Sequence, residues 1–124
     1  MEAISGATFA FFHDGVPDLI ENDLTRGSYR VMVGQAPVGE GPPMHVHPHT
    51  DEGFYIAEGE LVFAFPDREV VAGPNTFVFV PRGCAHTARI TQPMRGLLIY
   101  SPGDAEHVTP VSYTHLTLPT KRIV

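Results

Sequence analysis

The sequence is 124 residues long and carries 14 acidic against 8 basic residues, a formal net charge of -6, and this length suits a single domain. The acidic balance excludes the cationic surface with which nucleic-acid-binding proteins neutralise phosphates, and it makes an anionic membrane an unfavourable partner. The sequence predicts a cytoplasmic protein. It has a single cysteine, no apolar run of the roughly 20 residues that a membrane helix needs, and a start without the basic region of a signal peptide.

The first predicted elements are two strands separated by an irregular segment. Residues 7–12 (ATFAFF) and 28–36 (SYRVMVGQA) are rich in aromatic and β-branched residues and are bounded by turn signals. Residues 16–24 (VPDLIENDL) do not sustain a 3.6-residue period, so we expect a loop there, with one short helical turn as the alternative. Residues 1–27 are therefore predicted to be an N-terminal strand followed by an irregular segment.

Short apolar segments between closely spaced turn signals follow from Pro42 onward. Glycine and proline number twelve each, and turns are predicted at residues 58–60, 66–68, 72–75, 81–83, 92–96 and 101–104. The segments between these turns have the composition of strands: FYIAE, LVFAF, EVVA, TFVFV, HTARI and GLLIY. Because no helix-length periodic segment lies among them, the sequence predicts an all-β domain, an antiparallel jelly-roll β-barrel.

Residues 111–124 (VSYTHLTLPTKRIV) do not continue this pattern. They are rich in threonine, basic and without an expected partner strand, and one reverse translation of them resembles the transposon-end adapter of short-read sequencing libraries. We therefore expect the barrel domain to occupy residues 28–110 and to be truncated at its C-terminus, with residues 111–124 as a non-native tail. A genuine exposed tail is the alternative.

Four side chains able to bind a metal ion lie in two short segments. His45 and His47 are separated by one residue, and on a strand this spacing directs both imidazoles to the same face. Glu52 follows a bend at Pro48 and adds a carboxylate, while His86 follows a tight Pro-Arg-Gly turn and reaches the same cavity from across a barrel. Each residue alone is most simply a hydrogen-bonded or solvated side chain. Together they predict a site for one divalent transition metal: Fe, Mn, Ni, Cu or Zn.

The first segment also fits a longer motif. The motif is a glycine, five residues, His-x-His, three or four residues, Glu, six residues and a second glycine. Every fixed position is filled in this sequence, by Gly39, His45, His47, Glu52 and Gly59. The match resembles the first motif of the cupin family.

The second segment matches the second cupin motif in part. That motif is a glycine, five residues, Pro-x-Gly, two residues, His, three residues and Asn. The match runs from Pro81 to His86, with Asn75 in place of the first glycine and Ile90 in place of the final asparagine. Asparagine tolerates the left-handed backbone that a turn glycine supplies. The resemblance covers about residues 28–101 and implies a barrel that holds one metal through the three histidines and the glutamate.

Candidate pocket residues are less specific. Five side chains are predicted to be core residues, some of which also line a substrate pocket beside the metal: Phe54, Ile56, Phe63, Phe77 and Phe79. Their abundance indicates an apolar or aromatic small molecule. In one interpretation His49 is a spare metal ligand or a base beside the ligands. Pro48 disturbs its strand parity, however, so we favour a polar residue at the pocket mouth.

The predicted site leaves two of six octahedral positions open, which is enough for a bidentate substrate or for a substrate and dioxygen. The HxHxxxxE and VPRGxxH segments are similar to those of quercetin dioxygenase-like cupins, and this resemblance implies dioxygenase chemistry with Glu52 as ligand and catalytic base. Alternatives are a non-oxidative isomerase, lyase or epimerase, and a non-catalytic cupin that binds or senses a small ligand. We also expect a homodimer paired through edge strands.

Overall fold

The computed structural model describes residues 25–103 in full and, outside them, only the backbone of residues 3–4, 7–8, 18–20, 109–110 and 120–123. All secondary-structure elements that span more than one of the described residues are strands, and the long strands pair antiparallel to each other. The predicted all-β class is therefore confirmed. The strands are β1 (Ala3–Ile4), β2 (Ala7–Thr8), β3 (Asp18–Ile20), β4 (Arg30–Ala36), β5 (Gly39–Glu40), β6 (His45–Val46), β7 (Asp51–Phe65), β8 (Arg68–Ala72), β9 (Thr76–Val80), β10 (Thr87–Ser101), β11 (Thr109–Pro110) and β12 (Thr120–Ile123). No helix in these segments has the length and apolarity to cross a membrane.

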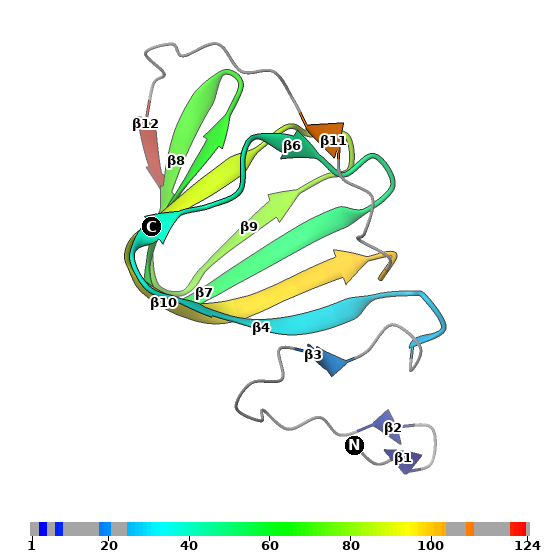
Figure 1. Ribbon diagram of the computed structural model, residues 1–124. Coiled ribbons are helices and arrows are strands. Elements are labelled where there is room, and N and C mark those ends of the chain that lie inside the picture. The colour runs from blue at the N-terminus through cyan, green and yellow to red at the C-terminus, as the bar shows by residue number, and fades with distance from the viewer. Residues whose placement is uncertain are drawn as a thin grey trace.

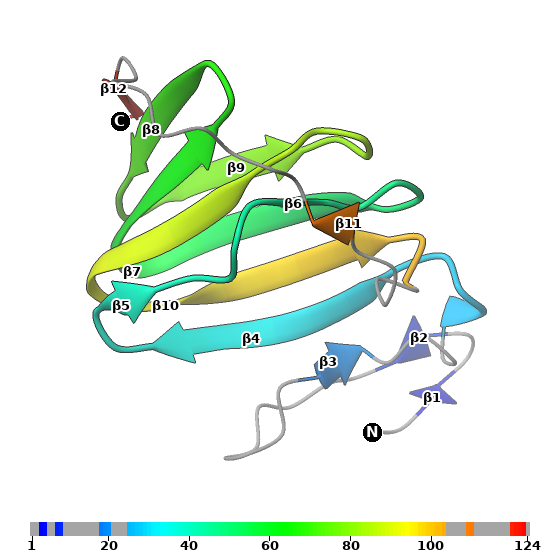
Figure 2. The ribbon, with the colours of Figure 1, turned by 45° about the horizontal axis from the view of Figure 1, so that its top comes forward.

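Two long strands, β7 and β10, hold the fold together. They pair with each other along most of their length, and each contributes to both halves of the curved sheet (Figure 1). The first half of β7 pairs with β9 and its second half with β8, while the second half of β10 pairs with β4. Figure 2 shows β4, β10, β7 and β9 lying side by side in this order. This half of the sheet has one face toward the interior of the barrel and one face toward the outside.

Two predicted turns are instead irregularities inside long strands. Residues 58–60 lie within β7, where Gly59 has a φ of +88°, and residues 92–96 lie within β10, where the pairing register shifts. Glycine marks a bulge as readily as a turn, and here both long strands pass through the bulge and continue pairing. The sequence interpretation, in which a turn separates two short strands at each of these positions, was therefore wrong.

The ends of the chain differ from expectation where they are described. Residues 18–20 form strand β3 against β4, so the prediction of a loop for residues 16–24 was wrong there. Residues 120–123 form β12, which pairs in parallel with β8, so this part of the tail does have a partner strand. Of the predicted strand at residues 7–12, only residues 7–8 are described, and they form β2. The domain boundaries themselves stay a prediction.

The core lies between the two halves of the barrel. Phe63 and Ile56 are fully buried, and the ring of Phe63 meets that of Phe54 edge to face with centroids 5.1 Å apart. Burying a side chain of this size contributes about 1.5–3 kcal/mol. Phe77 and Phe79, which we predicted to be core residues, are 52% and 58% exposed because they point to the outer face of β9. That part of the sequence interpretation was wrong.

Candidate metal centre

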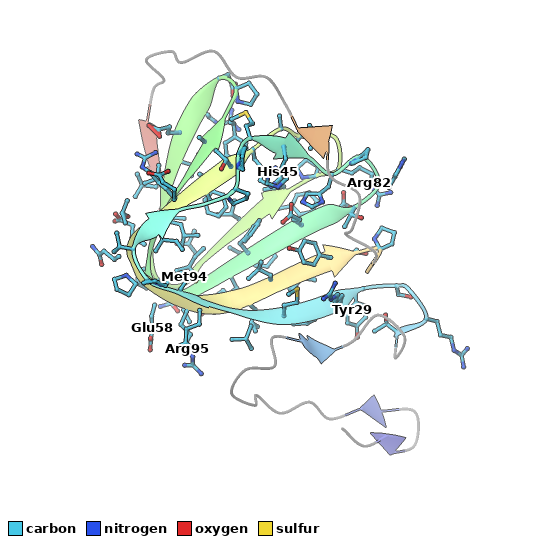
Figure 3. The ribbon with its side chains drawn as sticks, viewed as in Figure 1. Tyr29, His45, Glu58, Arg82, Met94 and Arg95 are labelled. Atoms are coloured by element: carbon cyan, nitrogen blue, oxygen red, sulfur yellow. The ribbon has the colours of Figure 1, made fainter. Side chains whose placement is uncertain are left out.

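The structure brings the four predicted ligands together on the inner side of the barrel. His45 lies on β6, Glu52 lies near the start of β7, and His86 directly precedes β10. One ligand atom from each of these residues and from His47 lies within 4.8 Å of the others. Figure 3 shows His45 on the concave side of the sheet. His47, Glu52 and His86 are 7%, 4% and 3% exposed, and His45 is half-buried, so three of the four ligands are enclosed by protein.

Backbone hydrogen bonds hold the two histidine segments side by side. The amide of His45 donates to the carbonyl of His86, and the amide of His86 donates back to His45, both at 3.0 Å. The amide of Gly83 donates to the carbonyl of His47 at 2.9 Å, which attaches the Pro-Arg-Gly turn to the first segment. Residues separated by about forty positions in sequence are thereby fixed against each other.

Hydrogen bonds on the far side of two imidazoles orient the rings. Nδ1 of His45 lies 2.9 Å from the carbonyl oxygen of Pro43, and Nδ1 of His86 lies 2.9 Å from that of Cys84. A carbonyl oxygen only accepts, so each Nδ1 carries the proton and each Nε2 keeps a lone pair. Metal-binding histidines in proteins are commonly fixed in this way by a carbonyl or carboxylate.

Glu52 lies at the centre of the group. Its Oε1 is 2.7 Å from Nε2 of His47 and 3.0 Å from Nε2 of His86. The same oxygen is buried and has no hydrogen bond of good geometry among the described residues, and Nδ1 of His47 is likewise without a partner. A buried acceptor without a donor is costly. Lone pairs that converge with no donor between them are what a divalent cation satisfies, so these residues fit the predicted metal.

Asp51, beside Glu52, ties the site to the turn that precedes His86. Its Oδ1 accepts a hydrogen bond from the amide of Arg82 at 2.8 Å, and the carboxylate also pairs with the Arg82 guanidinium at 3.2 Å. These hydrogen bonds lower the pKa of Asp51 below its ordinary value. Sequence reasoning could place Asp51 only in a turn, because its partner lies 31 residues away.

Burial gives the site's titratable groups different proton affinities. It is the main cause that lowers the pKa of His47, against the opposing charge of Glu52, and so favours the neutral imidazole that binds metals. Burial by itself would lower the pKa of His86 too, but Glu52 and the carbonyl of Cys84 outweigh burial, so the pKa of that imidazole is raised. Burial, assisted by the charge of Glu52, raises the pKa of Tyr100 to about 12. Tyr100 is therefore a neutral phenol at physiological pH.

A cavity of about 430 Å³ opens beside the four ligands. Its wall is mostly apolar and consists of Pro42, Pro43, Met44, His45, His47, Glu52, Phe54, His86, Thr87, Ala88, Leu98 and Tyr100. No lysine or arginine is among these described residues. The hydroxyl of Thr87 donates to the carbonyl of Pro42. The polar side chains left facing the cavity are therefore the four predicted metal ligands and the phenol of Tyr100.

The predicted pocket residues separate into four groups. Phe54 lines the cavity, whereas Ile56 and Phe63 lie behind it in the core. Phe77 and Phe79 lie on the opposite side of the sheet and do not contribute to the cavity. His49 is exposed and outside both the cavity wall and the ligand group, which corrects its placement in the pocket.

Among the residues of the cavity wall that sequence reasoning missed are Leu98 and Tyr100. Both lie on β10, and in the register of the sheet they stand opposite Phe54 and Glu52 on β7. The alternation of the segment GLLIY places them on one face, so strand parity contained the signal. Which face turned inward depended on the pairing with β7, which the sequence did not reveal.

Comparisons with known proteins show which sequences and folds this chain is similar to. The quercetin 2,3-dioxygenase of Bacillus subtilis is 29% identical over 66 residues, which are 53% of this chain and 20% of that protein. The chain thus spans about a fifth of the length of this curated relative. The DMSP lyase DddQ of Ruegeria pomeroyi has a similar structure, with a TM-score of 0.58 and 30% identity over 68% of this chain and 44% of that one.

One solved structure matches the fold over most of both chains. A protein with a double-stranded beta-helix domain from Klebsiella pneumoniae aligns with a TM-score of 0.63 and 19% identity, covering 84% of this chain and 91% of the other. The family model for the cupin domain matches residues 32–100, which are more than half of the chain and run from β4 almost to the end of β10. The chain belongs to the cupin family.

Proposed function

We propose that this chain is a metal-dependent enzyme in which His45, His47, Glu52 and His86 hold one divalent transition metal, Fe, Mn, Ni, Cu or Zn. The observation that carries the proposal is the convergence of three imidazoles and one carboxylate, within 4.8 Å of one another, at the wall of an apolar cavity. A bound divalent ion would supply Lewis-acid polarisation of a substrate oxygen.

The residues of the chain provide the rest of the chemistry. Glu52 is the only carboxylate on the described cavity wall, and its buried position beside two imidazoles makes it the candidate base for the proton of a substrate hydroxyl. Tyr100 donates a hydrogen bond rather than accepting a proton, because its pKa is raised to about 12. The apolar wall formed by residues such as Phe54 and Leu98 excludes water from the reacting atoms.

The cavity wall also indicates the class of substrate. With no cationic side chain on it, the wall offers no partner to a phosphate or to a second carboxylate. A small molecule with an apolar or aromatic body and one or two adjacent oxygen donors matches both the wall and the ligand group. Dioxygenase chemistry on such a molecule is the favoured reaction, supported by the similarity to quercetin 2,3-dioxygenase.

A non-oxidative lyase is the second candidate. It is favoured by the 30% identity with the DMSP lyase and by the phenol of Tyr100, a second proton-bearing group on the cavity wall. Such an enzyme would use the same ligands and the same base without dioxygen. A non-catalytic cupin that only binds a small ligand is the remaining alternative.

One set of measurements distinguishes these functions. The full chain is loaded in turn with each candidate metal, its metal content is determined by elemental analysis, and flavonol and β-diketone substrates are then followed with an oxygen electrode and by mass spectrometry. Oxygen uptake coupled to substrate loss supports the dioxygenase, and substrate loss under anaerobic conditions supports the lyase class. Saturable binding without turnover supports the binding protein. A chain that retains no metal under any loading condition contradicts the proposal itself.

A further inference from the structure

Leu98 lies on the cavity wall, one step along the strands from the polar groups of the site. It stands opposite Phe54 in the register of β10 and β7, just as Tyr100 stands opposite Glu52. Because the two pairs are two residues apart on each strand, they are separated by about 7 Å along the sheet. A substrate whose oxygens meet the metal ligands beside Glu52 therefore has Phe54 and Leu98 as the next inward side chains on these two strands.

The position of the Leu98 side chain depends on a glycine of the neighbouring strand. Gly34 lies on β4, diagonally beside Leu98, which pairs directly with Met32. A Cβ at Gly34 would lie 2.5 Å from Cδ1 of Leu98, closer than real Cβ atoms approach other atoms. It would lie 3.6 Å from Cε of Met94, which is an ordinary contact. The Leu98 side chain therefore occupies the space that any other residue in place of Gly34 would fill.

Leu98 has room to move in one direction only among the described neighbours of Gly34. Met94, whose side chain adjoins the same space, is 8% exposed and belongs to the core. Figure 3 shows Met94 well apart from His45, on the side of the barrel away from the metal ligands. Close-packed core side chains resist displacement. The cavity of about 430 Å³ lies on the other side of Leu98, so a larger residue in place of Gly34 would push Leu98 into the cavity.

The glycine paired with Gly34 is required for a different reason. Gly96 stands opposite Gly34, but a Cβ at Gly96 would overlap the carbonyl oxygen of Tyr55 on β7. Gly96 is thus needed for a close approach of two backbones. Gly34 meets only the ends of flexible side chains, so alanine in its place displaces Leu98 rather than a strand.

We propose that Gly34 is a positioning residue that determines, through Leu98, how bulky an apolar body the cavity accepts beside the metal ligands. This proposal rests on the proposed function, because it takes the cavity as the place where the substrate binds. Glycine lets Leu98 recede from the cavity and so makes room for a branched or ring-shaped group. Alanine excludes such a group while the four ligands and Tyr100 stay in place. In an apolar pocket, a difference of one methylene group changes affinity about tenfold or more.

The test compares two ligands that bind through the same oxygen donors but differ in apolar bulk. Catechol and 4-tert-butylcatechol are titrated calorimetrically into the full chain loaded with zinc, which has no redox chemistry of its own. The readout is the ratio of the Kd of 4-tert-butylcatechol to the Kd of catechol. Gly34→Ala should raise this ratio at least about tenfold. A merely structural role of Gly34, acting through stability or metal content, would weaken both ligands alike and leave the ratio unchanged.

Gly53→Ala is the matched control. A Cβ at Gly53 would lie 2.5 Å from Cζ of Phe77, the same distance as between Gly34 and Leu98. Phe77 is 52% exposed on the opposite side of the sheet, so its ring can turn into the solvent without reaching the cavity. Gly53→Ala should therefore leave the ratio of the two dissociation constants unchanged. An equal change of the ratio in both glycine variants would contradict the role of Leu98.

A double variant isolates the contact between Gly34 and Leu98. Leu98→Ala should lower the ratio, because it widens the cavity beside Phe54, and Gly34→Ala should have no further effect once the leucine is absent. These variants also decide the matter if Gly34→Ala alone does not fold, because the double variant contains no clash. A ratio that Gly34→Ala leaves unchanged, or raises equally with and without Leu98, would overturn the proposal.

Failure of the proposed function gives a different result from failure of this proposal. A chain that retains no zinc contradicts the metal site, but the same titrations of the metal-free chain still measure the ratio, because catechol hydroxyls donate to the lone pairs of Glu52 and the imidazoles. A ratio raised by Gly34→Ala in that form would support the role of Gly34 without the metal. Absence of catechol binding both with and without zinc would overturn the proposal, because the cavity would then not be a binding site.

Discussion

Three glycines of the two cupin motifs should differ sharply in their tolerance of alanine, although the sequence pattern treats them alike. Gly59 has a φ of +88°, and a Cβ there would overlap the carbonyl oxygen of Pro93 and lie 2.7 Å from Cα of Met94. Gly83 has a φ of +80° but nothing within 4 Å of its Cβ position. Gly39 has neither constraint. The structure therefore separates the backbone cost from the steric cost.

These differences set the expected loss of stability for each substitution. A left-handed backbone costs a residue with a Cβ about 1–2 kcal/mol, which is the whole expected loss for Gly83→Ala. Gly59→Ala adds the displacement of the β10 backbone, about 1–3 kcal/mol more by analogy with overpacking, for a total of about 2–5 kcal/mol. Gly39→Ala should be neutral or stabilise the chain by up to about 1 kcal/mol, because alanine restricts the unfolded state.

Urea unfolding followed by circular dichroism measures all three variants on one scale. The expected order of unfolding free energy is Gly39→Ala highest, then Gly83→Ala, then Gly59→Ala, with similar m-values throughout. Equal losses at Gly59 and Gly83 would show that the contact with Pro93 does not matter. A loss at Gly39 as large as that at Gly59 would refute the structural reasoning altogether.

Three further predictions concern the site. His47→Ala should abolish stoichiometric metal binding in elemental analysis while His49→Ala, outside the ligand group, retains it; equal metal content in both variants would remove His47 from the site. Arg82→Ala should make the chain less sensitive to acid: Arg82 lowers the pKa of Asp51, so the stabilisation is present above pH 3.8 and is lost as the pH falls through the lowered value. Acid unfolding curves of equal pH dependence would contradict this. Tyr100→Phe should remove a phenol that ionises near pH 12 in an absorbance titration. The raised pKa of Tyr100 stabilises the fold below pH 10, and that stabilisation is lost as the pH rises through 12. An unaltered high-pH titration in the variant would refute the assignment.

The ligand group was the part of the site that the sequence predicted best. Three of its members, His45, His47 and Glu52, lie within eight residues, so strand parity and one bend determine their relative placement. The fourth, His86, was inferred from its position after the Pro-Arg-Gly turn and supported by the second motif, because nothing local shows that its segment pairs with His45. The prediction that Asn75 replaces a turn glycine is confirmed, since its φ is 61°.

The side of the sheet on which apolar residues lie was not predictable. In the segment TFVFV both parities are apolar, so the pattern gave no reason to turn Phe77 and Phe79 outward rather than Val78 and Val80. Only pairing with β7, where Glu52 must face inward, determines the choice. Glycine-containing segments such as residues 58–60 were ambiguous for a related reason, since a bulge and a turn share the same local signal.

Alternate residues of strand β7 face the cavity and the outer surface of the sheet. Glu52 and Phe54 line the cavity, while Gly53 and Tyr55, one peptide unit away, belong to the opposite surface of the sheet. Substitutions at every second residue therefore change the cavity wall without changing the outer surface of the sheet. A mutational library restricted to Phe54 and its inward neighbours would search for new substrates without altering that surface.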